Sequence, residues 1–396
     1  MKTRTSVLVA ALFMASLNLR PGITSVSPIL DTLSHQLHMN SVVASLLTSI
    51  PVFCMGIFSP IIVRYASRFG MERVIAASMV LLAIATLLRW FTHSTGYLLL
   101  TTVLIGLGIS AVGPLLAGFV RHHFPRHMSS MIGLYSAALV IGAAAASGLT
   151  VPIQSEFGSW QLALSFWAIF AIVAIPFWFA AVLHPSATHH HESAVQNAPL
   201  PWTSGHAWLI TALFGLMGFL FFVFTAWLPP VVQTMGYNAA FAGVVSTVFT
   251  LVQIPMSSII SMLTRRHPDR RPWLMLCSLS ELVGLLLFVF TPVNPIVAAL
   301  FLGVGAGGLF TLTLLLPIDA TETASEASSW SAMVQSVGYV IGALGPIVIG
   351  SIHDAAHSYA PAFVLLIILI VVMLGIEWMV GRRPRPNIRH TLQDAK

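Results

Sequence analysis

Long apolar stretches, separated by short polar or charged breaks, make up most of this chain. Hydrophobic residues do not alternate with polar ones within the stretches, so the pattern predicts helices rather than the strands of a barrel. A helix needs roughly 20 apolar residues to cross a bilayer core of about 30 Å. The pattern predicts twelve spanning helices, over residues 6–32, 41–65, 71–92, 95–119, 128–152, 158–184, 205–231, 239–263, 272–292, 295–317, 326–351 and 359–380.

The composition supports a membrane protein. Of 396 residues, 57% are hydrophobic and only 8% are charged, whereas soluble domains carry roughly 25% charged residues. A chain this poor in charge could not cover a water-soluble surface, so we expect lipid to solvate most of it. Backbone groups in lipid need internal partners, and we therefore predict an all-α membrane protein.

The basic residues predict the orientation. Lys2 and Arg4 precede an apolar core as in a signal peptide, but no Ala-x-Ala-like cleavage site follows, which favours an uncleaved first span. Except for Arg20 and Arg89, every Lys and Arg falls on one side of the twelve predicted helices. Basic loops stay cytoplasmic. We therefore expect a multi-pass protein of the inner (plasma) membrane with both termini in the cytoplasm.

The two halves of the sequence resemble each other. Residues 140–143 (Val-Ile-Gly-Ala) recur at 340–343, and the glycine pattern of 104–108 recurs at 301–305. Asn40 likewise matches Asn238. The repeat predicts two six-helix bundles, 1–184 and 205–396, joined by a cytoplasmic linker, 185–204. The small residues from Gly142 to Gly148 predict close helix contact, either static or sliding.

The sequence argues against an enzyme. Lys2 and Lys396 are the only lysines, so no Walker A loop exists to hydrolyse ATP. No metal-ligand spacing occurs, Cys54 and Cys277 suggest no disulfide, and His189–His191 fits a solvated linker better than a metal site. We expect no cofactor, no metal and no nucleic-acid partner. The expected partners are the lipid bilayer and a small-molecule substrate, with protons as a candidate coupling ion, and we expect a monomer.

Arg20 is the most informative residue, because it lies inside the first span just before Pro21-Gly22. A cation at the bilayer centre costs roughly 2.5–3.5 kcal/mol on insertion scales and normally faces a cavity. No acid is placed to pair with it, which favours a role in binding a substrate anion. The alternative is that Arg20 bonds carbonyls freed at Pro21-Gly22. Arg89 lies near the end of its helix, where we expect it to reach the membrane interface.

Other polar and aromatic residues fall on helices expected to line a central cavity. They are candidates for substrate contact, with helix-to-helix bonding as the alternative, and for Trp227 interfacial anchoring as well. Glu281, near the middle of the ninth span, is a candidate for proton coupling, with an inter-helix hydrogen bond as the alternative. The candidate contact residues are Tyr135, Ser136, Trp227, Gln253, Thr311, Thr313, Gln335 and Tyr339.

Several segments carry a family resemblance. Leu17-Asn18-Leu19-Arg20-Pro21 resembles the first helix of the cyanate permease and nitroimidazole transporter group of the major facilitator superfamily. Residues 133–139, residues 226–229, Gln253 and the Gln335 segment are similar to the same group. One loop departs: where the superfamily has Gly-x-x-x-Asp-Arg-x-Gly-Arg-Arg, Val63 and Ser67 replace the first Gly and the Asp. The departure weakens any claim for the superfamily's usual cytoplasmic charge relay.

The resemblance implies a secondary active transporter whose two halves rock around a central site. It implies a small planar solute, polar or anionic. A cyanate charge would suit Arg20, with Asn18 from the same motif nearby. A 2-nitroimidazole would offer nitro oxygens to Arg20 and its ring to Tyr135 or Trp227. A multidrug exporter of the same fold is the alternative, although it would favour an acidic cavity residue, and a membrane sensor would need a larger soluble domain.

Overall fold

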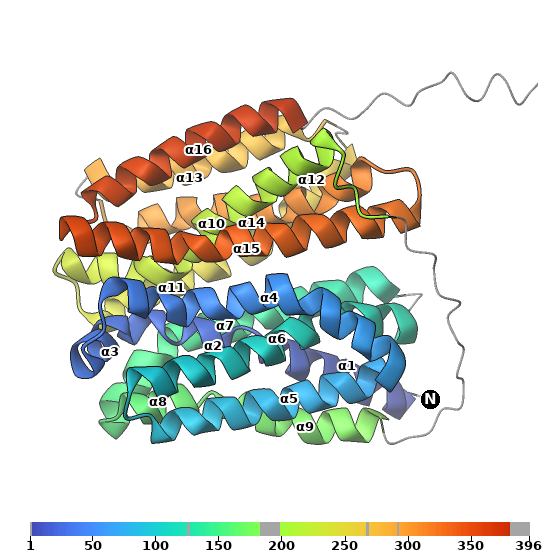
Figure 1. The fold of residues 1–396 in the computed structure, drawn as a ribbon, viewed down its shortest axis with the longest axis horizontal. Coiled ribbons are helices and arrows are strands. Elements are labelled where there is room, and N and C mark those ends of the chain that lie inside the picture. Colours follow the sequence, from blue (N-terminus) through green and yellow to red (C-terminus); the bar gives the residue numbers. More distant parts are fainter. Residues whose placement is uncertain (1, 125–126, 183–198, 267–268, 291–292, 381–396) are drawn as a thin grey trace, which may run out of the picture.

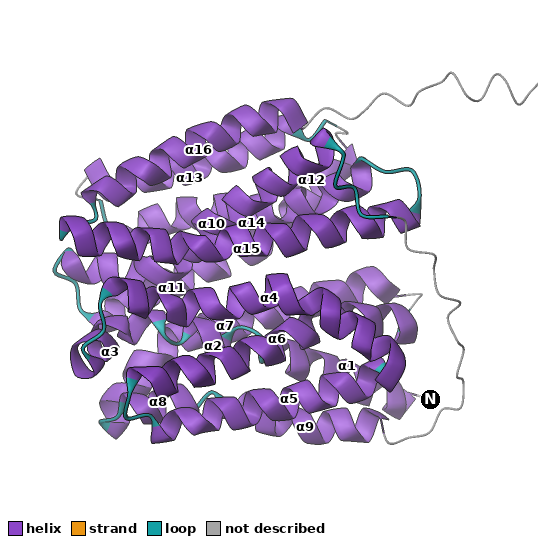
Figure 2. Ribbon diagram, viewed as in Figure 1, coloured by secondary structure: helices purple, strands orange, loops and turns teal. Residues whose placement is uncertain are grey.

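The computed structural model describes residues 2–124, 127–182, 199–266, 269–290 and 293–380, and all their regular elements are helices (Figure 2). Short breaks divide several of the predicted spans. The first part of the chain forms α1 (Lys2–Leu17), α2 (Pro21–Thr24), the 3-10 turn η1 (Ser27–Ile29), α3 (Leu30–Leu37), α4 (Ser41–Phe69), α5 (Met71–Leu88), the 3-10 turn η2 (Arg89–Phe91), α6 (Thr95–His123), α7 (Met128–Phe157), α8 (Trp160–Ser165) and α9 (Ala168–Val182).

The second part of the chain forms a separate bundle, which lies above the first in Figure 1. The two layers have their helices roughly along the same axis, with α4 beside α15 and α7 beside α11 between them. The second bundle consists of α10 (Gly205–Thr234), α11 (Ala239–Leu251), α12 (Gln253–Arg266), α13 (Arg271–Phe290), α14 (Pro295–Asp319), α15 (Ala324–Ala356) and α16 (Ala360–Val380).

Twelve helical stretches in the described part are long and apolar enough to cross a membrane, which confirms the predicted spans. Most of their bounds agree with the prediction to within a few residues. The fifth and eleventh run five residues past their predicted ends, to Phe157 and Ala356, and so does the first, to Leu37. In the first span the reason is that α3 continues the helix past the apolar core, with the exposed pair Asp31 and His35 on its surface.

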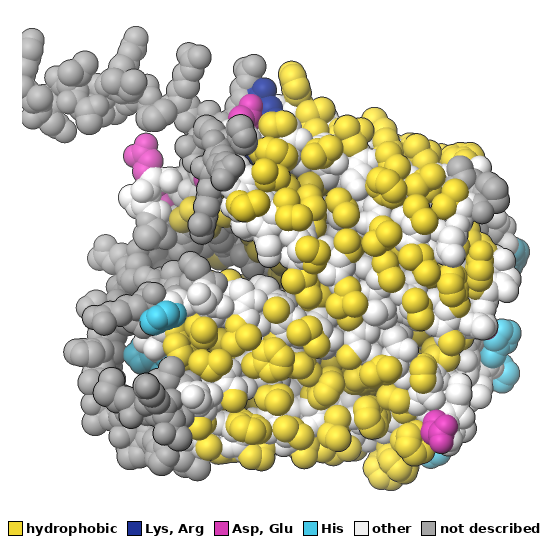
Figure 3. All heavy atoms as spheres, turned by 180° about the vertical axis from the view of Figure 1, so that it is seen from behind, with side chains coloured by type: hydrophobic (Ala, Val, Ile, Leu, Met, Phe, Trp, Pro, Cys, Tyr) yellow, Lys and Arg dark blue, Asp and Glu magenta, His cyan; other side chains and the backbone are white. Residues whose placement is uncertain are grey.

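The outer surface is apolar, as a bilayer requires (Figure 3). Charged side chains on the visible face gather toward the two ends, and yellow hydrophobic side chains cover the area between them. Val364 and Ile368 of α16 are each more than half exposed. Apolar exposure on this scale would make a water-soluble monomer aggregate, whereas lipid solvates it.

Equivalent residues of the internal repeat have the same structural role. Asn40 and Asn238 precede α4 and α11, and the Oδ1 of each accepts a hydrogen bond from a backbone N–H in the first turn, at 2.9 Å from Val43 and at 2.8 Å from Phe241. Both are N-caps, which satisfy donors that a helix start leaves without partners. The repeat therefore reproduces local structure as well as sequence.

The small residues of α7 allow the close approaches that the sequence predicted. A Cβ at Gly142 would overlap the carbonyl oxygen of Leu17 in the same bundle. A Cβ at Gly148 would meet the Thr247 side chain of α11 in the other bundle. One stretch of α7 thus packs against both a fixed neighbour and a neighbour across the interface.

The two bundles are joined by a polar group at one end of the molecule. We call this end the distal end. There α3 ends, α4 begins and α15 ends. We call the opposite end, where α1 begins, the proximal end. The carboxylate of Asp354 on α15 accepts hydrogen bonds from the backbone N–H groups of Ser41 and Val42, at 2.9 and 3.0 Å. The Ser41 hydroxyl lies 2.9 Å from Nδ1 of His353. A carboxylate at a helix N-terminus is stabilised by the helix dipole. We call this group the distal latch.

At the proximal end the surface is hollowed between the bundles, on the left of Figure 3. The two bundles are therefore joined at the distal end and parted at the proximal end.

Replacing the latch carboxylate should loosen the distal end. Asp354→Asn removes the negative charge at the α4 N-terminus. We expect it to destabilise the state in which the bundles touch at the distal end by about 0.5–2 kcal/mol. Spin labels at His35→Cys and Ala356→Cys would measure the distance between the two bundles there. We expect a longer-distance population to grow in Asp354→Asn. Glu156→Gln, an exposed carboxylate of α7 near the same end, is the matched control, and equal distributions in both variants would contradict the latch.

Candidate functional site

Arg20 lies where the first span is interrupted, between α1 and α2. Its guanidinium carbon is 5.3 Å from the ring centroid of Phe221, which belongs to α10 of the other bundle. A cation at this distance from an aromatic face is attracted by the ring. Arg20 therefore reaches across the interface between the bundles.

Two tyrosines complete the surroundings of Arg20. Tyr135 of α7 and Tyr339 of α15 are near enough to interact with it electrostatically. Each bundle thus supplies two members of the group formed by Arg20, Phe221, Tyr135 and Tyr339, which we call the Arg20 site. Among the described residues, no hydrogen bond or ion pair of the Arg20 side chain is present.

Arg89 does not reach the membrane interface, and that expectation is wrong. Its side chain is fully buried, and it donates from Nη1 to the Gly22 carbonyl at 3.1 Å and from Nη2 to Thr102 Oγ1 at 3.2 Å. The Gly22 carbonyl needs this donor because the Val26 N–H, its ordinary helical partner, bonds to Ile23 instead. Arg89 thus has the structural role that was the alternative for Arg20.

The other predicted contact residues do not all lie at the Arg20 site. Gln335 is half-buried and one turn before Tyr339 on α15, so it lies on the same side of that helix. Gln253 is half-buried at the start of α12 and donates to the Phe249 carbonyl at 3.0 Å. Asn18 turns back to donate to the Met14 carbonyl at 2.9 Å.

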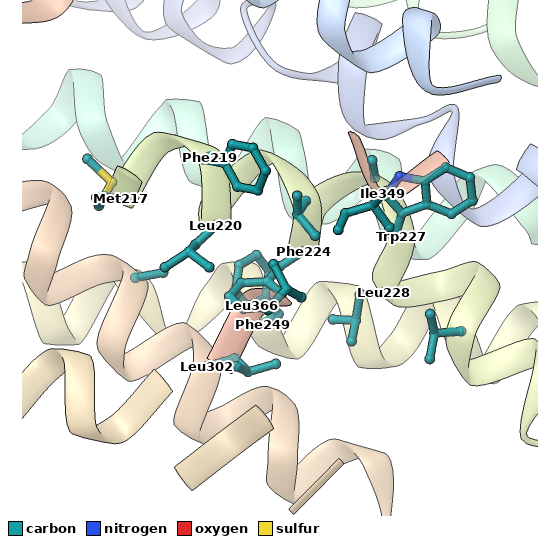
Figure 4. Close-up of a cluster of buried hydrophobic side chains, with 14 of the residues drawn as sticks. Met217, Phe219, Leu220, Phe224, Trp227, Leu228, Phe249, Leu302, Ile349 and Leu366 are labelled. Atoms are coloured by element: carbon teal, nitrogen blue, oxygen red, sulfur yellow. The ribbon is translucent and has the colours of Figure 1, made fainter. Parts of the chain in front are cut away.

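Trp227 lies away from Arg20, beside the distal latch. Its Nε1 donates to the Pro346 carbonyl at 3.0 Å, and its ring is stacked 6.3 Å from that of His353. Figure 4 shows it at the edge of the apolar cluster of the second bundle, with Phe224 and Ile349. Its indole N–H therefore already has a partner in the joined distal end.

The remaining chemical candidates lie elsewhere. Glu281 is on α13, which lies on the side of the second bundle away from the first (Figure 1). No group of three or more potential metal ligands occurs in the described part of the chain, and His189–His191 falls outside it. Phe221 was missed by the sequence reasoning, because it is one of several phenylalanines in the apolar run 219–224 and nothing in the pattern singles it out.

Residues 8–343 match the family model of the Major Facilitator Superfamily. The chain belongs to this superfamily. It is 32% identical over 387 residues to "Uncharacterized transporter YycB" of Bacillus subtilis (strain 168), covering 96% of this chain and 95% of the relative. Two proteins of Escherichia coli (strain K12) are 29% identical: the 2-nitroimidazole transporter, with 95% of each chain covered, and the cyanate transport protein CynX, with 94% and 97% covered.

A solved structure supports the same fold. A bacterial homologue of the lysosomal transporter Spinster, in an inward-facing and unoccupied conformation, superposes with a TM-score of 0.74 at 14% identity, covering 97% of this chain and 99% of that one. The family and these relatives confirm the predicted major facilitator fold and the resemblance on which it rested. The protein is a multi-pass membrane transporter of small solutes and not an enzyme.

Removing the bonds of Arg89 should destabilise the fold. Arg89→Ala leaves the Gly22 carbonyl buried without its donor, at an expected cost of about 1–3 kcal/mol. Thermal unfolding in detergent can be followed with a thiol-reactive dye, because Cys54 and Cys277 are free and buried in the folded protein. We expect an earlier transition for Arg89→Ala than for Arg73→Ala, which removes an exposed arginine of α5. Equal transition temperatures would show that Arg89 does not stabilise the break.

Proposed function

We propose that this chain is a secondary active transporter that moves a small planar solute, polar or anionic, across the inner membrane by alternating access. In this proposal Arg20 anchors the solute between the two halves, 1–184 and 205–396. The observation that carries the proposal is a guanidinium at the interface between the bundles, surrounded by aromatic rings and without an acidic partner among the described residues.

A cation in such a place favours an anionic or electron-rich ligand. Burying a charge without a partner is costly, so a bound anion would stabilise Arg20 while Arg20 holds the anion. The flat, forked guanidinium matches two oxygens in one plane, as in a nitro or carboxylate group. Phe221, Tyr135 and Tyr339 offer ring faces and hydroxyl groups to the rest of a planar solute.

The names of the relatives fit this chemistry. One relative is named as a transporter of 2-nitroimidazole and another as a transport protein for cyanate. Both solutes are small, one carrying a nitro group and the other a negative charge. We therefore take these two compounds as the first substrates to test.

The arrangement of the bundles suggests how the site would be reached. The hollow between the bundles lies at the proximal end, and the latch joins them at the distal end. With the basic segments in the cytoplasm, as the sequence predicts, this is the cytoplasm-facing state. Alternating access would then require the Asp354 latch to break while the proximal ends close.

A multidrug exporter is the second candidate. Such a protein would attract lipophilic cations, which need a carboxylate or an electron-rich cage in the cavity. The aromatic rings of the Arg20 site offer part of such a cage, but Arg20 would repel a cation there. The arginine therefore favours the anion or nitro compound.

Substitution of Arg20 should abolish substrate exchange. Counterflow of labelled cyanate and of labelled 2-nitroimidazole in proteoliposomes measures binding and translocation without an ion gradient. We expect Arg20→Ala to lower the counterflow rate at least about tenfold, corresponding to about 1.4 kcal/mol or more. Arg20→Lys should retain part of it, because the charge remains while the fork is lost.

Arg73→Ala is the matched control, because it removes an exposed arginine of α5 away from the Arg20 site. Thermal unfolding of each variant shows whether the protein is intact. Wild-type counterflow that persists unchanged in a folded Arg20→Ala variant would overturn the anchoring role.

A further inference from the structure

The second bundle buries two acidic side chains away from the Arg20 site. Glu281 of α13 and Glu377 of α16 have no exposed surface, and the two helices pack against each other. Ser278, one turn before Glu281 on α13, donates its hydroxyl to Glu377 Oε1 at 2.5 Å. Residues three apart on a helix share a face, so Glu281 and the Glu377 carboxyl group bound to Ser278 lie at the same contact between α13 and α16.

Most of the oxygen atoms of this pair have no partner. In the described part of the chain, neither oxygen of Glu281 has a hydrogen bond, and Oε2 of Glu377 has none. Buried polar atoms are normally paired, and an exception calls for an explanation. A proton bound to one carboxyl group would supply a donor for the other.

Among the described residues of the helices that pack around the pair, no cation interacts with either carboxyl group. On α13 the nearest titratable neighbour is the buried thiol of Cys277, and on α14 Gly305 meets the Glu281 side chain. Arg271 of α13 stands ten residues before Glu281, about 15 Å along the helix, with its guanidinium carbon 5.1 Å from the ring centroid of Trp378. Asp319, at the end of α14, pairs with Arg270.

Two carboxylates buried together without a cation would be costly, because each loses its hydration and repels the other. We propose that Glu281 and Glu377 form a proton-binding site, in which the two carboxyl groups share a bound proton, and that this proton is the coupling ion of transport. The second part rests on the proposed transport function. Binding adds one proton to a carboxylate oxygen, and release returns it to water.

One helix, α14, packs against both this proton site and α12. Gly305 of α14 lies against the Glu281 side chain, and Gly307 of the same helix lies against the backbone of Gln253 on α12. Both contacts are so close that a Cβ would not fit without movement. A change of charge at Glu281 therefore acts on a helix that also packs against α12 at Gln253, one of the predicted contact residues.

The proton itself can be observed without any substrate. Infrared spectra of the purified full-length protein in lipid, recorded across a pH titration, show the carbonyl stretch of protonated carboxyl groups. We expect such a band at neutral pH in the wild type, changed or lost in Glu281→Gln and in Glu377→Gln. Glu322→Gln, an exposed acid before α15, is the control and should leave the band intact. Absence of the band in the wild type, or an unchanged band in both buried variants, would overturn the proton site.

Coupling is tested by comparing two transport assays of labelled cyanate and 2-nitroimidazole. Counterflow needs no ion gradient, whereas accumulation under an imposed pH gradient does. We expect Glu281→Gln to keep wild-type counterflow but to lose roughly tenfold or more of the gradient-driven accumulation. Glu377→Gln is the second variant, should the first fail to fold. Gradient-driven accumulation equal to that of the wild type in both glutamate variants would overturn coupling. If the wild-type protein shows no counterflow, the substrate proposal is overturned. The infrared result would still decide the proton site.

Discussion

The hydrogen bond from Arg89 to the Gly22 carbonyl is the interaction on which the centre of the molecule depends. The Val26 N–H bonds to Ile23 rather than to Gly22, so the break leaves the Gly22 carbonyl without its helical partner in a region without water. Lipid cannot satisfy that carbonyl, so another span has to. Arg89, between α5 and α6, does so. Because Arg89 bonds to the break, the Arg20 side chain is not needed there; it makes no hydrogen bond among the described residues and lies against Phe221 of the other bundle.

The same balance between satisfied and unsatisfied groups distinguishes the distal end of the interface from its middle. At the distal end the backbone N–H groups at the α4 N-terminus donate to Asp354 of the other bundle. Further in, the guanidinium of Arg20 has aromatic neighbours but no acid among the described residues. A carrier needs this contrast. The contacts that close one end must be weak enough to break, and the central site must be stabilised more by its solute than by the side chains around it.

The spans could be predicted from the sequence because each apolar run of the required length is a local property of the chain. Arg20 could be singled out for the same reason, since a cation inside an apolar run is visible without any tertiary information. The location of Arg89 could not, because the sequence places it near a helix end and does not show that Gly22 lies beside it. Glu377 was missed likewise: the register that sets it against Ser278 and Glu281 depends on how α13 packs on α16, which neither helix encodes alone.

The two proposed sites complement each other in charge. Among the described residues, Arg20 in the first bundle is a cation without an anion, and Glu281 and Glu377 in the second are acids without a cation. Because they lie in different bundles and are held apart by packed helices, they cannot neutralise each other directly. A bound anion would neutralise the first, and one bound proton would reduce the charge of the second from minus two to minus one. A carrier loaded in this way moves one negative and one positive charge together, so the membrane potential would neither assist nor oppose its turnover.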